Sequence, residues 1–154
     1  MPPERHSRQI GGMTTVLASL HFQIPAEVPE WIHLVPAGSF SGVDGRGPFH
    51  MDDADAVITT SMDAGKLPVD ENHATDLAAS NGGPAPARGW IVAMEARPDG
   101  IWGRIEWTGT GRELLHDRAY RGISPVLLSA RADGRIIRIL RAALAMRMGF
   151  ARGT

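Results

Sequence analysis

The chain has 154 residues, 43% of them hydrophobic and 21% charged, and its 16 basic and 17 acidic side chains leave a formal net charge of -1 at pH 7. This length suits one domain with its own core, and the near-neutral charge gives no electrostatic basis for binding nucleic acid or an anionic membrane. The absence of cysteine excludes disulfides, thiolate catalysis and cysteine-based zinc sites, and no apolar run reaches the roughly 20 residues that span a bilayer.

The first half of the chain predicts short strands, one helix and many turns. Residues 1–12 are expected to form a disordered leader to a domain over residues 13–146. EWIHLVPAGSF, residues 30–40, is typical of a strand that runs into a turn. Acidic residues open the segment 52–65 and can cap the N-terminus of a helix there. The segment 66–80 is expected to form a short strand, a turn and then a helical turn.

A hairpin followed by a helix is expected next. WIVAMEAR, residues 90–97, alternates as a strand does, and a Pro-Asp-Gly turn leads to its partner IWGRIEWTG, residues 101–109. One face of that partner strand is expected to carry Ile101, Gly103, Ile105 and Trp107. Residues 110–120 favour an amphipathic helix, with Thr110 as its N-cap and Glu113 completing a capping box.

The last elements complete a mainly β pattern. Residues 122–130 favour a strand, Asp133 and Gly134 a hairpin turn, and residues 135–146 a return element whose second half fits strand or helix. About five or six strands and two short helices predict a mainly β fold with short helices (α+β). A small antiparallel barrel is one form that such a pattern takes.

His73 has the most suggestive surroundings of the six histidines. It follows a short apolar run and precedes a glycine-rich loop, and an imidazole exchanges protons near neutral pH. Asp70, His73 and Asp76 also have the spacing to ligate one cation, although no second histidine lies at HxH or HxxxH spacing. The residues alone favour no metal site, and they leave the base, the metal ligand and the ordinary polar residue as alternatives for His73.

Ser124 lies between an aliphatic β-former and a proline in YRGISPVLL, residues 120–128. In one interpretation it is a buried serine bonded to nearby backbone, with Pro125 marking a sheet edge because proline donates no ladder hydrogen bond. In the other it is a nucleophile, and Gly122 leaves room for a substrate backbone. A nucleophile needs an adjacent base and a donor for the oxyanion, and nothing here matches the GxSxG elbow of hydrolases.

Four blocks in order along the chain carry a resemblance to a known family. They are LVPAGSFSGVDGRGPF, LPVDENHAT, NGGPAPARGWIVAMEARPDGIWGRIEWT and YRGISPVLL, and they extend from about Trp31 to Leu128. Together they resemble the I protein family of Mu-like phages and prophages, the head-maturation protease that also supplies the scaffold. That family is similar to other prohead proteases and, distantly, to the herpesvirus assembly proteases. The resemblance implies a small, closed or partly open antiparallel β-barrel with helices.

The resemblance also implies roles for particular residues. His73 in DENH corresponds to the catalytic base, and Ser124 in ISPV to the nucleophile. The third member of a triad is open between Asp70 and Glu106. Asp70 can serve only if the chain turns before His73, because residues three apart on a strand point to opposite faces. An arginine after the serine is expected to help bind the oxyanion, and the candidates are Arg138 and Arg141.

The implied function is a serine endopeptidase that needs no cofactor. It would cleave phage scaffold and capsid-associated proteins, itself included, inside an assembling procapsid in the bacterial cytoplasm. A homo-oligomer is possible, and neither nucleic acid nor membrane is an expected partner. The alternatives are a non-catalytic assembly fragment from a degenerate prophage and a metal-dependent hydrolase.

Two departures from the family accompany these expectations. Ala87 and Arg88 stand where the family has two alanines, a change that an exposed loop would tolerate. Residues 147–154 are expected to be a divergent or truncated tail without the family's scaffold region.

Overall fold

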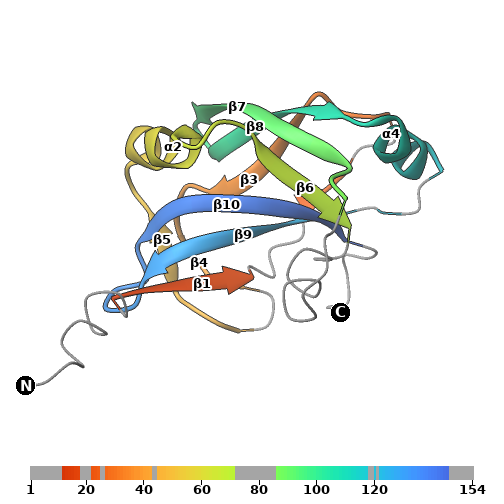
Figure 1. The fold of residues 1–154 in the computed structure, drawn as a ribbon. Coiled ribbons are helices and arrows are strands. Elements are labelled where there is room, and N and C mark those ends of the chain that lie inside the picture. The colour runs from red at the N-terminus through yellow and green to blue at the C-terminus, as the bar shows by residue number, and fades with distance from the viewer. Residues whose placement is uncertain are drawn as a thin grey trace, which may run out of the picture.

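A computed structural model describes residues 12–17, 22–24, 27–42, 45–71, 86–117, 120 and 122–145. Within these residues the protein is mainly β with two helices, as the sequence predicts. The helices are α2 (Ala54–Met62) and α4 (Gly109–His116), and they lie at opposite ends of a curled sheet (Figure 1). Neither is long and apolar enough to cross a membrane.

The large sheet has eight strands. Seven follow the order β1-β9-β10-β6-β7-β8-β3, and β2 also pairs with β9. These strands are β1 (Met13–Leu17), β2 (Phe22–Gln23), β3 (Trp31–Pro36), β6 (Leu67–Glu71), β7 (Gly89–Arg97), β8 (Gly100–Trp107), β9 (Gly122–Ala130) and β10 (Ile136–Ala145). Their pairings are antiparallel except for that of β10 with β6, which is parallel. A two-stranded sheet, β4 (Gly38–Phe40) with β5 (Phe49–Met51), stands apart from it.

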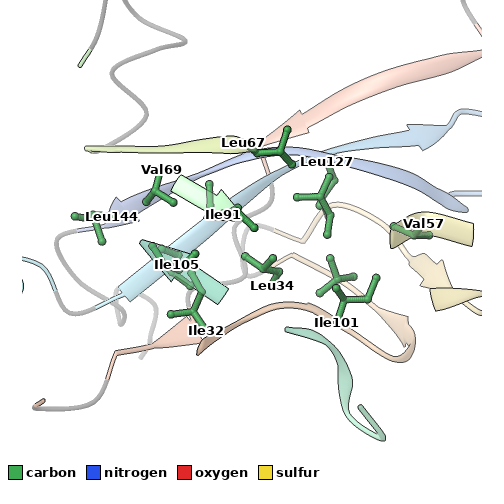
Figure 2. Packing of buried hydrophobic residues seen from close by; sticks show 14 of the residues in the cluster. Ile32, Leu34, Val57, Leu67, Val69, Ile91, Ile101, Ile105, Leu127 and Leu144 are labelled. Atoms are coloured by element: carbon green, nitrogen blue, oxygen red, sulfur yellow. The ribbon is translucent and has the colours of Figure 1, made fainter. Parts of the chain in front are cut away.

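The apolar core lies inside the curl of the large sheet. Figure 2 shows side chains from β3, β6, β7, β8, β9 and β10 converging there, with Val57 added from α2. The predicted alternation in β8 is confirmed, because Ile101, Gly103, Ile105 and Trp107 are all buried. The alternation of apolar residues therefore predicted correctly which face of this strand points inward.

Helix α4 begins earlier than the sequence predicts. Its N-cap is Thr108, whose hydroxyl accepts a hydrogen bond from the Gly111 amide at 3.0 Å. The prediction of Thr110 as N-cap, with Glu113 completing a capping box, was therefore wrong. Thr108 is favoured because its hydroxyl also donates to the carbonyl of Arg88 at 2.9 Å, which fixes the helix start against the strand β7.

The return element at the C-terminal side is one strand throughout. β10 pairs with β9 along its whole length and with β6 near its end, so sheet pairing on both sides decides the half that the sequence left open. Register shifts occur between Ile136 and Arg138 and between Ile139 and Arg141. Each irregularity changes the phase of the alternation, which is why the apolar spacing fits strand first and helix later.

Candidate active site

Ser124 lies on β9, in the interior of the large sheet, and only 3% of it is exposed. Strand β9 is not an edge strand of the sheet, because it has partners on both sides. On one side β1 pairs from Val126 onward and β2 pairs at Gly122 and Ile123. Among the described residues, neither strand pairs with Ser124 or Pro125, so the ladder on that side is interrupted at the serine.

Register across three strands brings Ser124 and Asp70 into one row. Ala143 of β10 pairs with Ser124 on one side and with Asp70 of β6 on the other. Paired residues on neighbouring strands point to the same face of a sheet. Because strands lie about 4.8 Å apart, the two outer Cα atoms of this row are separated by about 10 Å. The side chain between them, an alanine, is the smallest that has a Cβ.

This row faces away from the apolar core. The strand neighbours of its three members that belong to the core cluster are Ile123, Val69, Ala142 and Leu144. Alternation along each strand therefore directs Ser124, Ala143 and Asp70 to the opposite face. The row is nevertheless buried, with Asp70 2% exposed and Ala143 fully covered. The row therefore places a hydroxyl and a carboxyl group on one buried stretch of this sheet face.

The other candidate residues are placed as follows. Arg141 pairs with Val126, so it lies on the same face two residues from the row. The Arg138 guanidinium donates to the Thr60 carbonyl at 2.7 Å and so caps the C-terminal turn of α2. Glu106 lies on β8, which β10, β6 and β7 separate from β9. The structure thus brings Asp70 and Arg141 toward Ser124, and it holds Arg138 and Glu106 elsewhere.

Two of the predicted residues lie outside the described part of the chain. These are His73, the candidate base, and Asp76, which the metal alternative requires. Among the described residues there is no group of three or more histidine, aspartate or glutamate side chains that could hold a metal ion. The base and the metal alternative both stay predictions.

A cluster that the sequence did not predict lies at the end of β6. The Glu71 carboxylate accepts hydrogen bonds from Arg88 Nε and, at 2.9 Å, from the Tyr120 hydroxyl. Burial opposes ionisation of Glu71, but these two hydrogen bonds and the Arg88 charge outweigh it and lower the pKa of the carboxyl. Burial and the Glu71 carboxylate raise the pKa of Tyr120, so the phenol stays a neutral donor. Arg88 is therefore part of a half-buried cluster, and the expected exposed loop was wrong at this position.

The only sequence signal for this cluster was membership in the resemblance blocks. Glu71 belongs to LPVDENHAT, Arg88 to the PAPARGW block and Tyr120 to YRGISPVLL. Neither charge nor spacing connects residues so far apart in the chain. Only the fold shows that the three blocks meet.

A histidine–carboxylate pair lies at the small sheet. His50 Nδ1 and Asp52 Oδ2 are 2.6 Å apart, and Ser39 is the cross-strand partner of His50. Ser39 and Asp52 are exposed, and no hydrogen bond joins Ser39 to His50 within the described residues. Among the described residues, this hairpin therefore has the residue types of a triad without the nucleophile–base contact that defines one.

Comparison with known proteins identifies the family. The sequence profile described as Mu-like prophage I protein, N-terminal domain, matches residues 32–151. No curated protein and no solved structure gives a match. Because the matched residues make up well over half of the chain, the protein belongs to the Mu-like prophage I protein N-terminal domain family.

Proposed function

We propose that this member of the Mu-like prophage I protein family is a serine endopeptidase of phage head assembly, with Ser124 as its nucleophile. The observation that carries the proposal is the row of Ser124, Ala143 and Asp70 on the face opposite the core. We also propose that the curled sheet is a form of the barrel found in prohead and herpesvirus assembly proteases.

The spacing of the row suits one imidazole. Two hydrogen bonds of about 2.8 Å and the roughly 2.2 Å between ring nitrogens together span nearly 8 Å. The Cα atoms of Ser124 and Asp70 are about 10 Å apart by strand spacing, and both side chains rise from the same face. The Ala143 side chain adds only a methyl group between them, so it does not itself block a ring from lying between hydroxyl and carboxylate.

His73 is the histidine proposed for that place. Only Glu71 and Asn72 lie between it and Asp70, so chain connectivity keeps the two Cα atoms within about 11 Å. In the proposed mechanism the imidazole accepts the Ser124 proton as the hydroxyl oxygen attacks a peptide carbonyl. The imidazolium then protonates the leaving amine, and water hydrolyses the acyl-enzyme and restores the serine. Asp70 accepts a hydrogen bond from the far ring nitrogen and stabilises the imidazolium.

Arg141 is the arginine proposed to stabilise the oxyanion. It shares the face of the row and lies opposite Val126, two residues from the nucleophile. A cation at that position lowers the energy of a negatively charged tetrahedral intermediate more than that of the neutral carbonyl. Of the two candidate arginines, Arg138 is less suited because it pairs with Leu128, two residues farther along β9 from Ser124 than the partner of Arg141.

Scaffold and capsid-associated proteins, including other copies of the chain, are the proposed substrates. The proposed place of action is the assembling procapsid in the bacterial cytoplasm, where the enzyme can also form homo-oligomers. Confinement with the substrate raises its effective concentration, so a slow enzyme is sufficient there.

A non-catalytic assembly module is the alternative, and the burial of Ser124 favours it. With 3% of the residue exposed, a peptide carbonyl cannot reach the hydroxyl without movement of the atoms that cover it. A module would keep the same fold and use Ser124 only for packing. The two proposals therefore differ in whether Ser124 reacts.

A labelling and cleavage experiment separates the two proposals. Wild-type protein, Ser124→Ala and Ser129→Ala are each incubated with a fluorophosphonate, and separately with a Mu-like phage scaffold polypeptide. Ser129 is the matched control because it is on the same strand and equally buried, at 2% exposed. We expect labelling and cleavage fragments from wild type and Ser129→Ala, and neither from Ser124→Ala.

Further variants assign the remaining roles. His73→Ala is expected to lose cleavage, and Asp70→Asn to lower kcat by roughly 10³- to 10⁴-fold because the amide favours the wrong tautomer. Equal cutting by wild type and Ser124→Ala would remove Ser124 from the mechanism and leave the assembly module. Cleavage abolished by a chelator would instead favour the metal-dependent alternative.

A further inference from the structure

The cluster of Glu71, Arg88 and Tyr120 joins the two strand ends from which the proposed catalytic residues extend. Glu71 is the last residue of β6 and follows Asp70 directly. Tyr120 lies two residues before β9 begins and four before Ser124. The bond from the Tyr120 hydroxyl to Glu71 Oε1 therefore connects the β6 end to the β9 start.

No backbone ladder makes this connection. β10 lies between β6 and β9, and its residue Leu144 pairs with Glu71 on one side and with Ile123 on the other. Among the described residues, the backbone ladder connects these two strands through β10, and the Tyr120–Glu71 hydrogen bond adds a direct link between the end of β6 and the segment before β9. Such a bridge resists sliding of β6 against β9, because a hydrogen bond to a charged carboxylate is short and directional.

Arg88 connects the cluster to the start of β7 and to α4. Its side chain donates to Glu71, its amide donates to the Val69 carbonyl at 2.7 Å, and its carbonyl accepts from Thr108. The β6 end is therefore held to the start of β7 and, through Thr108, to the start of α4. Glu71 is one-quarter exposed, so the cluster is partly shielded from competition with water.

We propose that Glu71, acting through Tyr120 and Arg88, is a positioning residue that sets the separation of Asp70 from Ser124. The proposal rests on the proposed protease function. It assigns no contact with substrate to Glu71. Its effect is on the alignment of base and nucleophile, and small misalignments of such groups are costly to the rate.

The structure offers a matched control for this proposal. Glu95 and Arg97 of β7 form a second pair with the same atoms, Arg Nε to Glu Oε2. That pair joins two residues within one strand and does not bridge β6 to β9. Removing this pair measures how much activity and stability the protein loses with any partly exposed ion pair.

The experiment compares Tyr120→Phe, Glu71→Gln, Glu71→Ala and Glu95→Gln with wild type. For each we measure the rate of fluorophosphonate labelling of Ser124, kcat and KM on the scaffold polypeptide, and Tm. Tyr120→Phe is expected to lower the labelling rate and kcat about tenfold or more, with KM within about twofold of wild type. Glu71→Gln keeps an acceptor for Tyr120, so it should retain more activity than Glu71→Ala. Glu95→Gln should match wild type in all rates.

The outcomes separate the two proposals. Labelling that is lost in Ser124→Ala but unchanged in Tyr120→Phe and Glu71→Ala would overturn the positioning role and leave the protease proposal standing. The folded fraction of each variant is taken from its unfolding curve. A drop in kcat no larger than the drop in folded fraction would also overturn the positioning role. Wild-type protein that neither labels nor cleaves would overturn the protease function, and the positioning role with it.

Discussion

Two glycines in helix α4 should respond oppositely to the same substitution. A Cβ on Gly109 would meet nothing within 4 Å, whereas a Cβ on Gly111 would lie 2.0 Å from the Arg88 carbonyl oxygen. Gly109→Ala should therefore stabilise the protein by up to about 1 kcal/mol, because alanine has the higher helix propensity. Gly111→Ala must displace the Arg88 carbonyl, so this substitution should destabilise the protein instead.

The cost of Gly111→Ala follows from the contacts of that carbonyl. It accepts hydrogen bonds from the Thr108 amide and hydroxyl, both at 2.9 Å. Moving it by about 1 Å to relieve the overlap weakens both bonds, each contributing about 1 kcal/mol, and adds about 1–3 kcal/mol of overpacking strain. After the propensity gain, a net loss of about 2–4 kcal/mol remains, which lowers Tm by roughly 5–15 °C for a chain of this size.

Thermal and urea unfolding of the two variants measure these changes directly. Far-UV circular dichroism follows the melt, and the urea midpoints give the difference in unfolding free energy at constant slope. Equal Tm values for Gly109→Ala and Gly111→Ala would refute the close contact between α4 and Arg88.

Three other expectations concern caps, a buried hydroxyl and pH. Thr108→Ala should cost about 1–2 kcal/mol in unfolding free energy, whereas Thr110→Ala should change it by less than about 0.5 kcal/mol; the reverse order would restore Thr110 as the cap. Ser61→Ala should cost about 1–3 kcal/mol in urea unfolding, because the Ile139 amide loses its 2.8 Å acceptor; an unchanged midpoint would contradict that bond. The lowered pKa of Glu71 means that its stabilisation is present above the ordinary glutamate value of 4.5 and declines as pH falls below it. The urea midpoint of wild type should therefore exceed that of Glu71→Gln at pH 7 and approach it at pH 3, and a constant difference would contradict the assigned ionisation.

The sequence predicted those elements whose local pattern and tertiary environment agree. Strand β8 is an example, since a sheet with one face on the core requires the alternation that residues 101–107 show. The N-cap of α4 could not be chosen from sequence, because Thr108 and Thr110 both precede glycine and only contact with the Arg88 carbonyl decides between them. Strand β1 was also missed, and its pairing with β9 depends on segments from opposite ends of the chain.

In the candidate site, too, the residue types could be predicted from the sequence but their alignment could not. A serine on a strand and an aspartate on a strand were recognisable from their motifs. Their alignment was not, because it depends on the parallel pairing of β6 with β10, two segments far apart in sequence. A one-residue change in that register would turn Asp70 to the core face and would align Ser124 with a different side chain.

The row of Ser124, Ala143 and Asp70 holds two of the buried polar side chains that the structure describes. Among the described residues the buried polar side chains are Ser61, Asp70, Ser124 and Ser129. Ser61 has a structural role, since it accepts from the Ile139 amide and joins α2 to β10. Asp70 and Ser124 share one row on the face that the apolar core does not use, separated by a single alanine. That row puts a hydroxyl and a carboxyl group where the proposed hydrolysis needs them, whereas the burial of Ser124 favours the assembly module, so the labelling of Ser124 decides between the two proposals.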